Sequence, residues 1–386
     1  MSQARAFLVA VIALAGCDQL FNIQHVDSVR SDTGVDGPAN DTTGACVPAS
    51  TDYSVGANPY SVTVADLDNM NGPDIIVPGT GANNVTVLLN QGDGTFMPSQ
   101  VISTGNGPTH VVVADMNGDD ILDLVTMVNA GGHVRIDAGA GDGTFTVAQS
   151  IVTAGLAVAV GNLTADNYPD LVVVQKSANQ LQVILQVTPG NYTYGVPIAT
   201  VLGPEDIQLA DFDGDTKLDV VTVGQTSNAV QVLVGDGAGT FISKSQMAVG
   251  AAPDVISLGD INGDGVPDVA IGSAAGQRVD VLVSDGSGKF KSAQQLPVLA
   301  EVWGMALGDI NADSRLDVVA AQYTGPQGVR VFYGDTAGGF GAAMDLPGHG
   351  AGEGVAIADV DRRPPNDIVV ANWDRATVTV TLGCLP

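Results

Sequence analysis

The sequence predicts an all-β fold, a seven-bladed β-propeller of four-stranded antiparallel blades, and three observations support this prediction. An acidic segment recurs seven times at a nearly constant interval. The same short runs of β-branched and apolar residues surround each copy and end in turns rich in glycine and aspartate. Helical periodicity is absent along the chain. Repeats with several short strands each are typical of propeller blades.

The acidic segments set the period of the repeat. Their first residues are Asp66, Asp115, Asn162, Asp211, Asp260, Asp309 and Asp359, at intervals of 49, 47, 49, 49, 49 and 50 residues. Each segment follows one β-rich run, such as HVVVAD, and precedes a second, such as DVVTVG. A third run ends in a glycine-rich turn, as in VLVGDGAGTF, and a fourth follows the phenylalanine. Each repeat therefore supplies four strands.

The two ends of the repeat region complement each other. The last repeat stops after its third strand, ATVTVTLG, whereas TDYSVG, ahead of the first acidic segment, resembles a fourth strand without a third. We expect these two strands to pair and close the ring, which would bring Cys46 close to Cys384. In an exported protein this placement favours a disulfide bond, and two free thiols are the alternative.

The first 16 residues have the pattern of an export signal, since Arg5 precedes the apolar run AFLVAVIALA, which is too short to span a bilayer. The following LAGC, residues 14–17, resembles the lipobox of bacterial lipoproteins, in which cleavage precedes an acylated cysteine. We expect Cys17 to be the lipidated N-terminus of an exported protein of the bacterial cell envelope, held at the outer membrane or cell surface. An ordinary secretory signal is the alternative. Residues 17–45 are polar and predict a flexible tether, so the propeller domain spans residues 46–386.

Composition limits the partners of the chain. It has 386 residues, 45% of them apolar and 15% charged, which is enough for a packed core. The formal net charge of -28 argues against nucleic acid and against an anionic lipid surface. A cationic partner fits this charge better. We expect a monomer that contacts the membrane only through its N-terminal lipid.

The combination of the GDGTF turn with D-x-D-x-D-G-x-x-D loops resembles the FG-GAP repeat, also called the VCBS repeat, of integrin α subunits and many bacterial surface proteins. The resemblance covers nearly all of residues 46–386. It implies a seven-bladed propeller that binds calcium in the loops between the first and second strands of its blades.

The chemistry of the acidic loops also favours calcium. In ADFDGDTKLDVV, residues 210–221, Asp211, Asp213 and Asp215 alternate with other residues, and Asp219 begins the next strand. A hard cation of this size takes six to eight oxygen ligands, which a curling loop of this spacing can present. Without a cation the carboxylates would repel one another. We expect the ions to stabilise the fold rather than to act in catalysis.

The loops differ in how completely they match this ligand pattern. Four of them have an oxygen ligand at all four positions: Asp115, Asn117, Asp119 and Asp123; Asp211, Asp213, Asp215 and Asp219; Asp260, Asn262, Asp264 and Asp268; Asp309, Asn311, Asp313 and Asp317. Two others are weaker candidates, one with Asn162, Thr164, Asp166 and Asp170, and one with Asp66, Asp68 and Asp74 around Met70. In the loop of Asp359, Asp361 and Asp367, Arg363 occupies the third position, where its guanidinium could replace the ion. The pattern predicts about four to six calcium ions.

A ligand-binding surface is predicted on the opposite face of the ring. We expect two sets of residues to lie there: those six positions before the first ligand position of each acidic loop, and those six positions after the fourth. Both tryptophans of the chain are among them. Blades six, seven and one contribute the candidates Trp303, Tyr323, Trp373 and Tyr60, with Glu353, Asp374 and Arg375 close by. Such aromatic residues are suited to protein or sugar contacts. The alternative is that they fill gaps between blades.

The sequence contains no recognisable catalytic motif. His110, His133 and His349 have no partner at a catalytic spacing, and we expect them to be surface residues. The predicted function is therefore a calcium-binding, lipid-anchored binding or adhesion propeller that recognises a protein or glycan and is not an enzyme. A polysaccharide lyase or hydrolase on the same scaffold, or a purely structural envelope component, are the alternatives.

Overall fold

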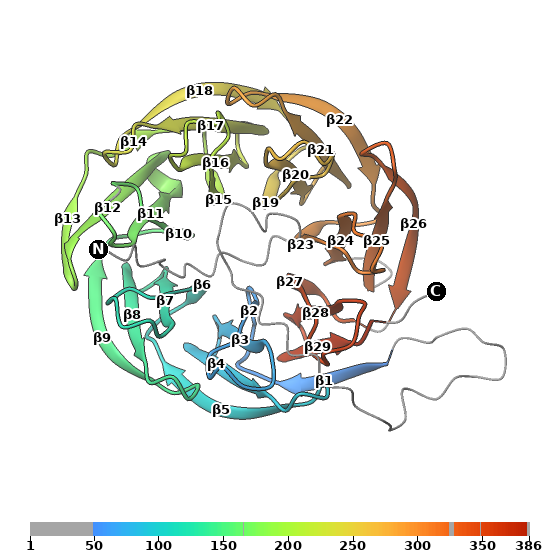
Figure 1. The fold of residues 1–386 in the computed structure, drawn as a ribbon, viewed down its shortest axis with the longest axis horizontal. Helices are drawn as coiled ribbons and strands as arrows, with labels where there is room; N and C mark the ends of the chain where they lie inside the picture. Colours follow the sequence, from blue (N-terminus) through green and yellow to red (C-terminus); the bar gives the residue numbers. More distant parts are fainter. Residues whose placement is uncertain (1–48, 165, 324–327, 348, 384–386) are drawn as a thin grey trace, which may run out of the picture.

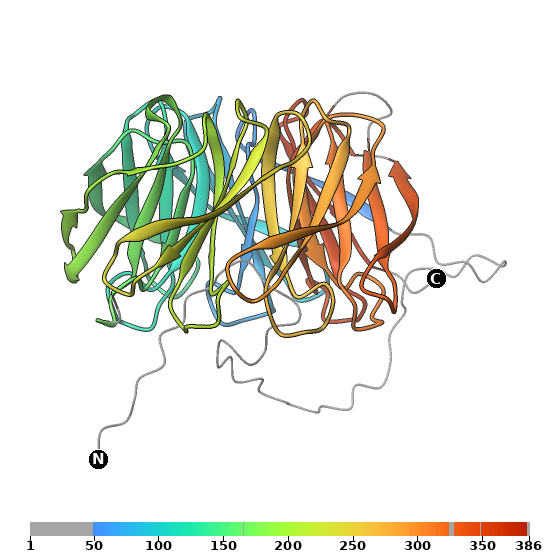
Figure 2. The same cartoon turned by 90° about the horizontal axis from the view of Figure 1, so that it is seen from above.

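A computed structural model describes residues 49–164, 166–323, 328–347 and 349–383. Seven antiparallel sheets surround one axis, so the predicted propeller is confirmed (Figure 1). The innermost strand of each blade lies next to the axis, the outermost strand forms the rim, and the side view shows a flat disc (Figure 2). Cys17, Cys46 and Cys384, and with them the predicted signal, tether, lipidation and disulfide, lie outside the described residues.

Blades one to three follow the chain from the inside outwards, and each begins at the axis. Blade one consists of β2 (Thr63–Ala65), β3 (Asp74–Gly79), β4 (Asn84–Asn90) and β5 (Phe96–Ser103). Blade two consists of β6 (Pro108–Ala114), β7 (Asp123–Val128), β8 (His133–Gly139) and β9 (Phe145–Val152). Blade three consists of β10 (Val158–Gly161), β11 (Asp170–Gln175), β12 (Gln180–Thr188), β13 (Asn191–Tyr194) and the short β14 (Ile198–Ala199).

Blades four to six repeat the same order. Blade four consists of β15 (Pro204–Ala210), β16 (Asp219–Gly224), β17 (Ala229–Gly235) and β18 (Phe241–Ala248). Blade five consists of β19 (Pro253–Gly259), β20 (Asp268–Ser273), β21 (Arg278–Ser284) and β22 (Phe290–Pro297). Blade six consists of β23 (Val302–Gly308), β24 (Asp317–Gln322), β25 (Gly328–Gly334) and β26 (Phe340–Pro347).

Blade seven closes the ring with strands from both ends of the chain. It consists of β27 (Gly352–Ala358), β28 (Asp367–Asn372), β29 (Thr377–Thr381) and β1 (Ser50–Ser54). Strand β1 pairs antiparallel with β29, with Ser50 opposite Thr381 and Ser54 opposite Thr377. The predicted closure by the N- and C-terminal strands is therefore confirmed.

The apolar core is divided into layers between adjacent blades. In blade four, for example, Val221 and Val223 of β16 pack against Ile256 and Leu258 of β19 in blade five. The phenylalanine of the glycine-rich turn is buried in such a layer in five blades, at Phe96, Phe145, Phe241, Phe290 and Phe340. This burial explains why a phenylalanine recurs after the turn. Blade three has the turn sequence VTPGNY in its place and departs from the repeat there.

Candidate functional site

The seven acidic segments lie in the loops between the innermost and second strands of the blades, as predicted. The fourth aspartate of each segment begins the second strand and is buried, with at most 1% of its surface exposed. Asp219 shows its role: it accepts hydrogen bonds from the N–H groups of Phe212 at 2.9 Å and Gly235 at 2.8 Å. Equivalent pairs of backbone bonds hold the other six, which are Asp74, Asp123, Asp170, Asp268, Asp317 and Asp367. This residue therefore ties the acidic loop and the third strand to its own strand.

The first aspartate organises the loop itself. The Oδ1 atom of Asp211 accepts hydrogen bonds from the N–H groups of Asp213, Gly214 and Asp215 at 3.3, 2.7 and 3.2 Å, and its Oδ2 accepts one from Thr216 at 2.7 Å. Asp115, Asp260 and Asp309 accept similar bonds in their loops. The loop is thus wound around one carboxylate, which brings the second and third ligand positions towards it.

The loop of Asp211 fits a hard cation. Carboxylate oxygens of Asp211, Asp213 and Asp215 lie within 4.8 Å of one another. The Oδ1 atom of Asp213 is buried and has no hydrogen-bond partner among the described residues. An oxygen in this state is stabilised by a donor or a cation. Carboxylates of Asp66, Asp68 and Asp74, and of Asp359, Asp361 and Asp367, are equally close together, although the sequence makes these two loops weaker candidates.

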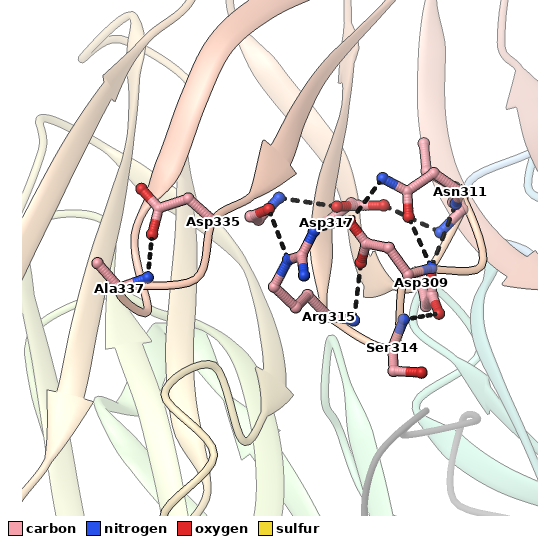
Figure 3. A network of polar contacts seen from close by, with 10 residues as sticks. Asp309, Asn311, Ser314, Arg315, Asp317, Asp335 and Ala337 are labelled. Carbon is pink, nitrogen blue, oxygen red and sulfur yellow. Dashed lines mark hydrogen bonds and ion pairs between the residues drawn. The ribbon is translucent and has the colours of Figure 1, made fainter. Parts of the chain in front are cut away.

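Basic side chains contact two of the loops, which the sequence reasoning missed. Lys217 pairs with Asp215 at 2.8 Å. Arg315 pairs with Asp313 in the loop of Asp309, where Figure 3 shows it beside the bonds within the loop. Both basic residues follow the third ligand position by two residues, and this spacing is visible in the sequence. They partly neutralise the loops and would compete with an ion.

The loop of Asp359 departs from the expected pairing. The backbone N–H of Arg363 donates hydrogen bonds to Asp359 and Asp361, each at 2.9 Å. The ion pairs found among the described residues do not include the guanidinium of Arg363. The backbone of Arg363 therefore bonds to both carboxylates, and its positive charge only partly opposes the rise that burial causes in the pKa of Asp361.

A pocket of about 110 Å³ lies at the axis, on the side where the innermost strands begin and therefore opposite the acidic loops. It is lined by Tyr60, Glu205, Asp254, Trp303 and Glu353, all at positions six before a first ligand, which the sequence predicts to lie on this face. Thr109 and Leu156, at the equivalent positions of blades two and three, do not line it, whereas His110 does. A second pocket, of about 270 Å³, lies between blades two and three around Leu156 and Lys176.

β-Bulges at the start of the innermost strands place the side chains at this pocket. Pro253 pairs with Ser273 and Val255 with Gly272, so Asp254 is the extra residue of a bulge. Trp303 and Glu353 occupy the same position in blades six and seven. A bulge interrupts the alternation of a strand and redirects the extra side chain. In blade two Thr109 is the extra residue of the equivalent bulge, but the neighbouring His110 lines the pocket instead.

The acidic residues of the pocket differ in the ion pairs and hydrogen bonds that they make. Glu205 pairs with Lys176, and Gln225 connects Lys176 at 3.0 Å to Asp254 at 3.3 Å. Both oxygens of Asp206 accept backbone hydrogen bonds, from Ile207 at 2.7 Å and Ile256 at 2.8 Å. Glu353 is 5% exposed and makes no hydrogen bond or ion pair with the described residues.

Burial shifts the pKa values of these groups. It raises the pKa of Glu353 to about 8, and the charge of Asp254 adds to the shift. Burial, together with the charges of Glu205 and Asp206, also raises the pKa of Asp254 to about 7. The pKa of Asp206 is raised to about 7 by burial, although its backbone bonds oppose the shift. The pocket therefore holds carboxyl groups that resist ionisation near neutral pH.

The aromatic candidates form two groups next to the pocket. The rings of Trp303 and Tyr323 are stacked, with centroids 4.7 Å apart and an angle of 19°. Tyr60 makes edge-to-face contacts with Trp373 at 6.4 Å and with His110 at 5.6 Å. All five rings are half-buried. The structure thus brings together the aromatic residues of blades six, seven and one, and adds His110 of blade two.

The remaining predicted residues have local roles. Asp374 and Arg375 are exposed, and Asp374 accepts a hydrogen bond from the N–H of Ala351 at 2.9 Å while Arg375 donates to the carbonyl of His349 at 3.5 Å. The prediction of surface histidines is wrong for His349, which is 2% exposed. Burial lowers the pKa of His349, and that of His110, to about 4. The spacing of these histidines in the sequence does not reveal their burial.

Comparison with known proteins agrees with this architecture. A family model described as an FG-GAP-like repeat matches residues 71–126, 211–271 and 260–320. No curated protein matches the sequence. Within the described residues no helix is long and apolar enough to cross a membrane.

Solved structures share the fold at low sequence identity. BBS1N, from a complex with ARL6DN, is 13% identical, with a TM-score of 0.61 over 86% of this chain and 94% of that one. Virginiamycin B lyase from Staphylococcus aureus is 13% identical, with a TM-score of 0.59 over 87% of this chain and 100% of that one. An Agrocybe aegerita lectin that recognises non-reducing terminal N-acetylglucosamine is 18% identical, with a TM-score of 0.52 over 75% of this chain and 80% of that one. These solved structures show the fold alone, whereas the matches to the FG-GAP-like repeat, together with the seven blades, support an FG-GAP repeat propeller.

Proposed function

We propose that this propeller is a calcium-binding, lipid-anchored protein of the bacterial cell envelope that binds a protein or glycan ligand on the face opposite its acidic loops. One observation carries the proposal: half-buried aromatic residues of three neighbouring blades gather at a pocket on the axis, where Tyr60 and Trp303 line the pocket and contact Trp373 and Tyr323. Aromatic side chains beside a concave surface supply large contact areas at a small cost in conformational entropy.

The solved structures with this fold support binding as a general use of the scaffold. BBS1N was solved in a complex with ARL6DN, and the Agrocybe aegerita lectin recognises a sugar. Both are distant in sequence, so the choice between a protein and a glycan rests on experiment.

The ligand can be sought on glycan and peptide arrays, with calcium and with chelator. Substitution of the aromatic residues then tests its position. Trp303→Ala or Trp373→Ala should weaken binding by about 1 to 3 kcal/mol, as is common for aromatic residues at the centre of an interface. Tyr194→Ala, an exposed aromatic residue on the outer strand β13, is the control and should leave the affinity unchanged. Loss of binding in the control alone would place the ligand elsewhere.

Calcium in the acidic loops is the second part of the proposal. The close carboxylates of the Asp211 loop and the unpartnered oxygen of Asp213 support it. Ions that bind only the folded state stabilise it by about 2.7 kcal/mol per site at a concentration of 100 times Kd. Calcium should therefore raise the melting temperature, and prolonged dialysis against EGTA should lower it. Equal melting temperatures, with metal analysis showing that dialysis removed the bound calcium, would contradict a stabilising role.

Lipid attachment at Cys17 is the third part, and it concerns a residue outside the described ones. Mass spectrometry of the protein isolated from membranes should show acyl chains on Cys17. A soluble product cleaved after a different residue would contradict it.

A lyase or hydrolase activity on polysaccharide is the second candidate function. Glu353 and Asp254, with pKa values raised to about 8 and about 7, could serve as acid and base. Virginiamycin B lyase shows that an enzyme can use the fold. Release of new reducing or unsaturated ends from surface polysaccharides, abolished by Glu353→Gln, would favour this candidate over binding alone.

A further inference from the structure

On one side only, the axial pocket has an acidic side chain without a hydrogen-bonding or basic partner among the described residues. On the side of blades four and five, Lys176 forms an ion pair with Glu205 and donates a hydrogen bond to Gln225, which in turn donates one to Asp254. On the side of blades six and seven, Glu353 faces the pocket with no partner among the described residues, and it is 5% exposed. Ionising a buried carboxyl group that has no partner is costly in free energy, so an occupant that carries positive charge would stabilise the ionised form.

The surroundings of Glu353 also point to a ligand. Trp303 lines the same pocket, and its ring nitrogen Nε1 is buried without an acceptor among the described residues. Tyr60 also lines this pocket. Burial raises the pKa of its hydroxyl, and the charges of Asp254, Glu205, Glu353 and Asp206 raise it further. The four carboxyl groups therefore act on one small volume that Tyr60 and Trp303 help to line.

The arrangement suits an organic cation better than a metal ion. The groups of three or more carboxylates whose oxygens lie within 4.8 Å of one another in the described part of the chain are in the acidic loops, and no such group lies in the pocket. A single metal ion needs several oxygens at about 2.3 to 2.6 Å, whereas an ammonium group can bond to carboxylates that are further apart. Aromatic faces next to carboxylates also attract ammonium groups.

We propose that the axial pocket binds a primary alkylammonium group, supplied by a lysine side chain of a partner protein or by a small free amine. The ammonium would donate hydrogen bonds to Glu353 and Asp254, and its alkyl chain would pass between Tyr60 and Trp303. The inference rests on the proposed function, because it names the chemistry of a ligand on the same face. It also agrees with the net charge of -28, which favours cationic partners.

The test titrates the full-length protein with two amines at a fixed, saturating calcium concentration. One probe is 1,5-diaminopentane and the other is Nα-acetyl-lysine methylamide; 1-pentanol and the Nε-acetylated lysine derivative are the neutral controls. Calorimetry and tryptophan fluorescence report binding. The amines should bind, and the neutral controls should not. Preference for the lysine derivative indicates a protein partner, and preference for the diamine indicates a free amine.

Substitutions decide whether the pocket is responsible. Glu353→Gln keeps the shape of the side chain and should weaken amine binding at least tenfold, and Asp254→Asn should weaken it as well. Glu301→Gln, at a half-buried glutamate that does not line the pocket, is the matched control and should leave binding unchanged. Circular dichroism confirms that each variant is folded.

The possible failures are distinct. No amine binding, equal binding by Glu353→Gln, or displacement of the amine by added calcium would overturn the inference. If an array ligand depends on Trp373 while amines do not bind, the inference fails and the proposed binding function stands. If amines bind in a manner that depends on Glu353 while no macromolecular ligand depends on Trp303 or Trp373, the proposed function fails and the ammonium site stands.

Discussion

Asp219 shows how one residue type can serve two purposes in the same loop. By its position in the motif it looks like the last ligand of a cation, yet both of its oxygens accept backbone hydrogen bonds. Burial raises its pKa to about 6 in spite of these bonds. The recurrence of an aspartate at this position in all seven blades thus has a structural cause that does not depend on calcium.

We predict that Asp219→Asn lowers stability with and without calcium. Its amide N–H₂ would face a backbone N–H, so one hydrogen bond would be lost and a buried donor left without an acceptor, at a cost of about 2 to 3 kcal/mol. Thermal and denaturant unfolding measure the effect. Asp215→Asn, at an exposed ligand position, is the control and should lower only the stabilisation by calcium. The same calcium-dependent loss in both variants would assign Asp219 to the ion instead.

Glu353 makes stability depend on pH. Its pKa, raised by burial to about 8 from an ordinary value of 4.5, means that the folded state keeps a proton that the unfolded state releases. The contribution to stability is therefore complete below the ordinary pKa and is lost as the pH rises to about 8, by about 1.4 kcal/mol for each pKa unit.

We predict that Glu353→Gln raises the melting temperature relative to the unsubstituted protein at about pH 8.5 and leaves it nearly unchanged at about pH 5. The difference between the two proteins is the quantity to measure, because Asp206 and Asp254, with pKa values of about 7, titrate in the same range. A difference that does not change with pH would show that Glu353 has an ordinary pKa.

Among the elements, the innermost strands depend most on close contact between blades. A Cβ atom on Gly304 of β23 would lie 2.6 Å from the carbonyl oxygen of Glu353 in β27, and one on Gly354 would lie 2.7 Å from the backbone of Ser61. Glycine at these positions lets blades six, seven and one approach each other at the axis. The same contacts position Trp303 and Glu353 at the pocket.

We predict that Gly304→Ala destabilises the propeller by about 1 to 3 kcal/mol, because neighbouring backbone cannot move aside as a flexible side chain can. Gly341→Ala, in the exposed outer strand β26, is the control, since the nearest atom to its new Cβ would be the Tyr333 oxygen at 3.7 Å. Equal melting temperatures for the two variants would show that the blades can separate at the axis without cost.

For the whole molecule, the pairing of β1 with β29 joins the two ends of the described chain. The N–H of Leu382 donates a hydrogen bond to the carbonyl of Ala49 at 2.9 Å, just inside the positions of Cys46 and Cys384 in the sequence. A link between these cysteines would close a loop that contains the entire ring.

We predict that Cys46 and Cys384 form a disulfide bond in exported protein, where the chain-entropy model gives about 5 kcal/mol for so long a loop. A digest under non-reducing conditions should contain the linked peptides, and reduction should lower the melting temperature. Cys46→Ser together with Cys384→Ser should reproduce the effect of reduction. Recovery of both thiols in alkylated form from oxidising conditions would refute the bond.

The sequence by itself determined the number of blades, their strand order, the acidic loops and the closure of the ring. These features follow from local periodicity and turn chemistry. The pattern occurs seven times in the sequence, so one irregular copy such as blade three does not obscure it. The sequence also predicted that the aromatic candidates lie opposite the acidic loops. The innermost strands run in the same direction in every blade, so residues at the same distance from the loop reach the same face of the ring.

Only the tertiary structure decided which side chains meet at the axis and which lack a partner. Asp254 follows Glu205 by 49 residues, and Glu353 follows Asp254 by 99 residues. Bulges, which shift the strand pairing by one residue, turn these side chains to the pocket. The same holds for Asp219, whose partners depend on how loop and strand pack, and for the burial of His349. Hydrogen-bond partners and burial are set by contacts between segments distant in sequence, and local patterns do not encode them.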